Sequence, residues 1–121
     1  MLLKDLYKIN SFEKDDTILK ASIHLNKEHA VFKGHFPNNP VMPGVCMIQI
    51  IKELTEQALN VELFMEKSSN IKFMLLINPE VHRDLTLELK ITKEDNTIKV
   101  KNITKFEDTL ALKFNGTYRV V

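Results

Sequence analysis

One segment of this chain has a clear helical period, and most of the sequence around it alternates with the period of a strand. Between Val45 and Leu59, apolar residues recur at spacings of three and four, at Met47, Ile50, Ile51, Leu54 and Ala58. Such spacing places one apolar stripe along a helix. The pattern therefore predicts a single long helix, entered at Pro43-Gly44 and ended at Asn60.

The alternating segments predict an antiparallel sheet. Apolar and polar residues alternate in the stretches 17–25, 85–91, 97–103 and 109–121. Polar turns at 93–96 and 107–108 separate the last three of these stretches. Consecutive strands joined by short turns pair antiparallel. The fold class predicted is α+β, with five or six strands that can wrap the one helix.

Two segments are harder to place. Residues 71–77 form a nearly continuous apolar run, which suits a strand covered on both faces, deep in the sheet or at an interface. Residues 1–10 carry a weak helical pattern. We therefore predict a covered strand at 71–77, whereas the pattern at 1–10 is too short to assign to an element.

Size and charge limit the classes of protein that fit. The chain has 121 residues, which suits one domain spanning 1–121. Lys+Arg number 17 against 16 Asp+Glu, and the lysines are scattered along the chain, so the sequence shows no footprint for nucleic acid or anionic lipid. Cys46 is the only cysteine and the N-terminus lacks a signal-peptide run, which favours the cytoplasm. No apolar segment approaches the roughly 20 residues of a membrane span.

Residues 32–45 contain three of the four prolines and two of the three glycines. These residues predict a long, rigid loop directly before the helix. Such a loop can fix the imidazole of His35 while the N–H groups of Gly44 and Val45, at the positive end of the helix dipole, meet a carbonyl oxygen or an oxyanion. A structural histidine in a turn shaped by proline is an equally open interpretation.

Gly-His-Phe-Pro at 34–37, followed by Pro-Val-Met-Pro-Gly-Val at 40–45 and a helix, resembles the hot-dog-fold 3-hydroxyacyl-[acyl-carrier-protein] dehydratases of type II fatty acid synthesis. Ile-Lys-Phe at 71–73 extends the resemblance more weakly. The resemblance implies an antiparallel sheet wrapped around one long central helix, dimers formed by joining two sheets, and an acyl tunnel at the dimer interface.

The resemblance also implies roles for individual residues. His35 matches the catalytic histidine, which takes a proton from C2 of the substrate, and Gly44 matches the backbone donor to the thioester carbonyl. Substrate-binding positions carried over in the same way are Phe36, Met42, Pro43, Val45 and Phe73.

The chain departs from the family on the helix. The family has a catalytic carboxylate where this chain has Gln49, and a glutamine one turn later where this chain has Glu53. A glutamine has no proton to exchange near neutral pH, although it can hold a hydroxyl or a water. Glu53 either assists through a water or is a solvated helix residue near Lys52 and Gln57.

The resemblance implies dehydration of 3-hydroxyacyl thioesters, carried on acyl carrier protein or coenzyme A, to trans-2-enoyl thioesters. Two alternatives remain: an acyl thioesterase, and a noncatalytic acyl-binding or partner subunit, which Gln49 favours. The expected assembly is a homodimer, a larger oligomer of dimers or a heteromer with another dehydratase. No phosphate-binding loop is present and the histidines have no metal-ligand spacing, so neither a cofactor nor a metal is expected.

Overall fold

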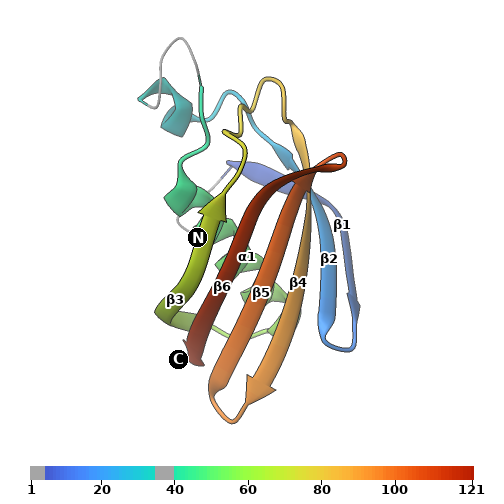
Figure 1. The fold of residues 1–121 in the computed structure, drawn as a ribbon, viewed down its shortest axis with the longest axis vertical. Coiled ribbons are helices and arrows are strands. Elements are labelled where there is room, and N and C mark those ends of the chain that lie inside the picture. Colours follow the sequence, from blue (N-terminus) through green and yellow to red (C-terminus); the bar gives the residue numbers. More distant parts are fainter. Residues whose placement is uncertain (1–4, 35–39) are drawn as a thin grey trace.

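The computed structural model describes residues 5–34 and 40–121. Its elements, in chain order, are β1 (Tyr7–Asp15), β2 (Ile18–Leu25), the 3-10 helix η1 (Ala30–Lys33), α1 (Gly44–Leu59), β3 (Leu63–Phe73), β4 (Asp84–Glu94), β5 (Thr97–Phe106) and β6 (Thr109–Val120). The six strands of this described part form one antiparallel sheet in the order β1-β2-β4-β5-β6-β3, and α1 lies against its concave face (Figure 1). The predicted α+β class, with a sheet wrapped around one long helix, is confirmed.

The core lies between the sheet and α1. Inward-facing residues of β2, β4, β5 and β6 are almost completely buried, as are the helix residues Met47, Ile50, Ile51 and Leu54. The helix ends where predicted, because Asn60 adopts a left-handed conformation (φ 54°, ψ 49°) and its N–H bonds the Glu56 carbonyl. The apolar stripe predicted for the helix is therefore its buried face.

The apolar run at 71–77 differs from its prediction. The strand ends at Phe73, and β3 is an edge strand that pairs only with β6 among the described strands. Ile71, Phe73 and Met74 are 39%, 48% and 41% exposed, so the prediction of a position deep in the sheet is wrong. Sheet order is set by long-range pairing, which a local apolar run does not report. The alternative position, at an interface, remains a prediction.

The N-terminal segment forms a strand in its described part. Tyr7 to Asn10 belong to β1, where Tyr7 pairs with Leu25, rather than to a helix. Pairing with β2 outweighs the weak local helical pattern, as tertiary context commonly does. The polar first part of β3 and the short helix η1 were not predicted.

Lysines that are scattered in the sequence gather on the convex face of the sheet. Lys90 of β4 lies directly opposite Lys101 of β5, and Lys113 of β6 lies directly opposite Lys72 of β3. Lys90, Lys101 and Lys113 alternate with buried residues, and Lys72 pairs with Lys113, so all four point away from α1. This face is therefore rich in cations, although its lysines are far apart in the sequence. In the part of the chain that the structure describes, no helix is long and apolar enough to cross a membrane.

Candidate active site

The N-terminus of α1 presents backbone donors without a side-chain cap. Pro43 is the N-cap residue, with φ −61° and ψ 139°, and makes no side-chain capping bond. The Cys46 N–H reaches the Pro43 carbonyl at 3.0 Å, whereas the earlier N–H groups precede the first helical acceptor. The Gly44 N–H therefore belongs to the positive end of the helix dipole, where an oxygen ligand is favoured.

Gly44 is in close contact with Phe73. A Cβ atom built on Gly44 would lie 2.7 Å from Cζ of the Phe73 ring, closer than real Cβ contacts come. Glycine is therefore needed here because it lets an aromatic ring from the end of β3 lie against the helix backbone. Two residues far apart in the sequence meet at this point.

An apolar cavity of about 270 Å³ begins at this contact. Its lining includes Met42, Gly44 and Phe73 from the predicted site; the other lining residues are Val41, Met47, Leu75, Leu76 and Ile77. Pro43 and Val45 do not line it, and Val45 is 75% exposed. The cavity offers an apolar surface of the kind that takes a short acyl chain.

His35 and Phe36 lie outside the described residues. The chain is held on both sides of this gap: the Gly34 N–H bonds the Phe32 carbonyl, and the Met42 N–H bonds the Ile77 carbonyl at 2.7 Å. The roles assigned to His35 and Phe36 therefore remain predictions.

Gln49 and Glu53 are in direct contact on α1. Nε2 of Gln49 donates to Oε2 of Glu53 at 3.1 Å, and the Tyr7 hydroxyl donates to Oε1 of the same carboxylate at 2.8 Å. Glu53 is only 8% exposed. The interpretation of Glu53 as a solvated helix residue is therefore wrong, because the β1 strand covers it and supplies a hydrogen-bond donor.

Tyr7 was not recognised as a site residue from the sequence. Burial, together with the hydrogen bond to Glu53 and the negative charge of Glu53, raises the pKa of the Tyr7 phenol above its ordinary value. The hydroxyl therefore stays protonated and acts as a donor. The available signal, an aromatic residue opening a strand, was hidden by the weak helical pattern at 1–10.

Gln49 and Glu53 border a second, more polar cavity of about 470 Å³. Lys52 and Glu56 of α1 also line it, as do Leu63 at the start of β3 and Val121 after the end of β6. This cavity shares no lining residue with the apolar one at Gly44. Among the described residues, one protomer thus brings together Met42, Gly44 and Phe73, and separately Gln49 and Glu53.

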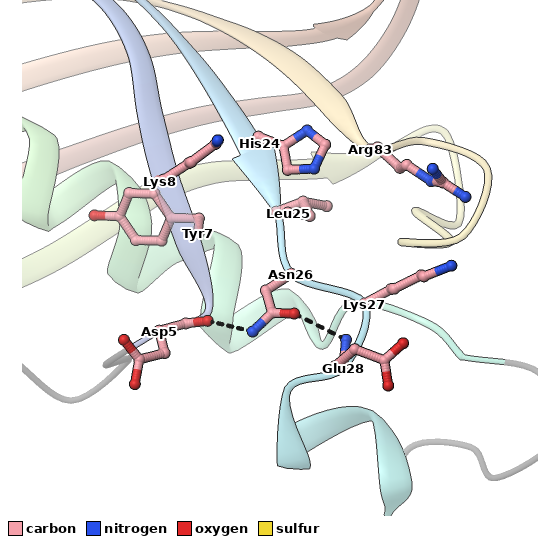
Figure 2. A pocket seen from close by; sticks show the side chains of 9 residues that line it. All are labelled: Asp5, Tyr7, Lys8, His24, Leu25, Asn26, Lys27, Glu28 and Arg83. Atoms are coloured by element: carbon pink, nitrogen blue, oxygen red, sulfur yellow. Dashed lines mark hydrogen bonds between the residues drawn. The ribbon is translucent and has the colours of Figure 1, made fainter.

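A larger cavity, about 690 Å³, lies at the end of β2 and contains none of the sequence-predicted site residues. Asn26 organises it, accepting from the Glu28 N–H and donating to the Asp5 carbonyl (Figure 2). His24 bonds Asp84 at 2.9 Å beside it. Elsewhere His82 accepts from the Asn78 N–H. No group of three or more His, Cys, Asp or Glu within 5–34 and 40–121 is arranged to hold a metal ion.

Comparison with known proteins gives a consistent result. The family model described as ApeI-like, ApeI dehydratase, matches residues 11–114. The 3-hydroxyacyl-[acyl-carrier-protein] dehydratase FabZ of Lactobacillus helveticus is 30% identical, with 93% of this chain and 80% of that protein covered.

Solved structures share the fold. The dehydratase heterocomplex ApeI:P from Xenorhabdus doucetiae superposes with a TM-score of 0.75 at 18% identity, covering 93% of this chain and 96% of that one. A hypothetical thioesterase with coenzyme A from Streptococcus pneumoniae gives a TM-score of 0.67 at 14% identity, covering 95% and 85%. At these identities the likeness establishes the hot-dog fold and nothing finer.

Proposed function

Because the chain belongs to the family of ApeI-like dehydratases, we propose that it removes water from 3-hydroxyacyl thioesters to give trans-2-enoyl thioesters. The observation that carries the proposal within the structure is the apolar cavity against Gly44, at the uncapped N-terminus of α1. It places an acyl-sized apolar surface beside a backbone donor. The acyl group is carried on acyl carrier protein or coenzyme A.

The proposed reaction follows from three groups. The Gly44 N–H donates to the thioester carbonyl, which makes the C2 proton more acidic. His35 takes that proton, the C2–H electron pair forms the C2=C3 double bond, and the C3–O bond breaks. The departing hydroxyl takes a proton and leaves as water. Since Gln49 has no proton to give, the imidazolium formed on His35 returns its proton to the hydroxyl, which Gln49 holds by a hydrogen bond.

We propose that the working unit is at least a dimer. The outer edge of β3 has no strand partner among the described residues, and Ile71 and Phe73 are exposed on the α1 side of that edge. An exposed apolar edge strand readily pairs with another chain. A second copy paired along β3 would place residues of one protomer beside the cavities of the other, which are separate within a single protomer. Buried Cys46 is a free thiol, which suits a cytoplasmic setting.

The test is turnover of purified protein. We expect water loss from 3-hydroxyacyl thioesters, and the reverse hydration of enoyl thioesters, to fall by roughly 10² to 10⁴ in His35→Ala. The control is His24→Ala, which removes an exposed histidine that bonds Asp84. Unchanged activity in His35→Ala would refute the assigned base, and hydrolysis of simple acyl thioesters would favour a thioesterase instead.

Gln49 favours one second candidate, a partner subunit that completes the site of another dehydratase. The solved ApeI:P dehydratase is a heterocomplex. This candidate predicts that the purified chain turns over no thioester alone but raises the activity of a co-expressed dehydratase. Turnover by the isolated homodimer would exclude it.

A further inference from the structure

A hydrogen-bonded chain connects β1 to the helix position that carries the family difference. The Tyr7 hydroxyl, 46 residues before Glu53, donates to one carboxylate oxygen of Glu53 at 2.8 Å. Nε2 of Gln49 donates to the other oxygen at 3.1 Å. Each oxygen of this buried carboxylate therefore receives one donor, and the three side chains form a continuous chain from the sheet edge to Gln49.

This arrangement decides which way the Gln49 amide points. Nε2 is held against Glu53 by one of its two N–H bonds, so the carbonyl oxygen lies on the side of the amide turned away from Glu53 and can face a ligand. Turning the amide over would set its carbonyl oxygen 3.1 Å from a carboxylate oxygen, and two acceptors at that distance repel. The orientation therefore depends on Glu53 staying where Tyr7 holds it.

Tyr7 is well suited to this task. Its ring packs beside the buried core. Figure 2 shows it among the residues that line the cavity at the end of β2, where it points toward α1 and away from the other polar side chains. Its pKa is raised, chiefly by burial, so the hydroxyl remains a donor over the working pH range. Glu53 makes no ion pair within the described residues, so the Tyr7 hydroxyl and the Gln49 amide are the donors that hold it there.

We infer that Tyr7 is a positioning residue, which acts through Glu53 to present the carbonyl oxygen of Gln49 to the 3-hydroxyl group of the substrate. The inference rests on the proposed dehydratase function. A hydroxyl that donates its hydrogen to Gln49 keeps its oxygen lone pairs free for the incoming proton. Gln49 thereby acts as an acceptor that orients the leaving group, a different task from the proton delivery of a carboxylic acid.

The variant Tyr7→Phe tests the inference, with Tyr118→Phe as its matched control. Tyr118 is a buried tyrosine whose hydroxyl has no hydrogen-bond partner in the described structure, so its loss changes no such chain. We expect kcat of Tyr7→Phe to fall about tenfold, the effect of one hydrogen bond to a charged group, with KM changed by less than about twofold. Tyr118→Phe should keep the wild-type kcat.

A double-mutant cycle separates positioning from general damage. In a Gln49→Ala background, Tyr7→Phe should cause no further loss of kcat, because the group that it orients is gone. An equal loss in both backgrounds would overturn the inference. Thermal unfolding of each variant shows whether folding contributes.

The side-chain amide resonances of Gln49 give a readout that does not need turnover. In ¹⁵N-labelled protein we expect Tyr7→Phe to shift them and Tyr118→Phe to leave them in place. Unshifted resonances in a folded Tyr7→Phe protein would overturn the inference. A wild-type protein that turns over no thioester would refute the proposed function, whereas the amide resonances would still decide whether Tyr7 orients Gln49.

Discussion

At the residue scale, Gln49 and Glu53, where the resemblance implies an exchange of acid and amide over one helical turn, are structurally coupled. Gln49 and Glu53 are four residues apart and bond each other directly. A substitution at either position therefore changes a hydrogen-bond partner of the other residue. The family carboxylate therefore cannot simply be restored at position 49 while Glu53 stays unaffected.

Gln49→Glu should raise dehydratase turnover and make stability depend on pH. Two carboxylates in contact raise the pKa of the pair, so one proton stays bound near neutral pH and can be delivered to the leaving hydroxyl. Because the folded state then binds more protons than the unfolded state, the free energy of unfolding should fall as pH rises from about 4.3 through the raised pKa. Urea unfolding at pH 5 and pH 8 measures this.

The double variant Gln49→Glu with Glu53→Gln is the control. It has the same two side-chain types as the wild type in the family order, with one carboxylate and no like-charge pair. Its stability should therefore lack the extra pH dependence. If Gln49→Glu alone behaves like the wild type at both pH values, the two carboxylates are not in contact in the folded protein.

At the element scale, the end of β3 and the start of α1 are fitted to each other. Phe73 lies on the backbone of Gly44, so the helix N-terminus, the apolar cavity and the sheet edge meet at one contact. A change of one methyl group at that contact affects all three.

Gly44→Ala should destabilise the protein by about 1 kcal/mol, the low end of overpacking costs, because the Phe73 ring is half exposed and can move. Gly34→Ala is the matched control, since an added Cβ meets nothing within 4 Å there. Replacing Phe73 with Leu in the Gly44→Ala background should recover part of the loss. Equal urea midpoints for the two single variants would contradict the close contact.

The strands carry a second testable feature, the like-charge pair of Lys90 and Lys101. Lys101→Glu should stabilise the protein by roughly 0.2 to 1 kcal/mol at low salt, because it places opposite charges directly across two strands. The gain should shrink at high salt. Lys99→Glu is the control, because Lys99 lies between Thr92 and Thr117. An equal gain in both variants would refute the pairwise explanation.

At the scale of the whole molecule, the proposed dimer depends on the edge of β3. Ile71 lies on the α1 side of this strand, opposite buried Phe114, yet it is 39% exposed in the single chain. A partner strand across this edge would cover it. The cation-rich convex face makes back-to-back stacking of two sheets unfavourable, because like charges would meet.

Ile71→Lys should convert the protein to a monomer and remove its activity, as measured by light scattering and turnover. Ile103→Lys is the matched control: Ile103 is 40% exposed but lies on the convex face of β5. The Ile103→Lys variant should stay dimeric. A wild-type protein that is monomeric at assay concentrations, or dissociation by both variants, would contradict the β3 interface.

The sequence by itself determined the long helix, its end at Asn60 and the strands that alternate, because those features depend on side-chain period and on local backbone preferences. The residues of the helix entry loop also indicated the family. Only the tertiary structure decided that β3 is an edge strand, that Phe73 lies on Gly44 and that Tyr7 bonds Glu53. Each of these is a contact between residues distant in the chain. Alternation tells which way a side chain faces, but the neighbour that it meets depends on strand order and register.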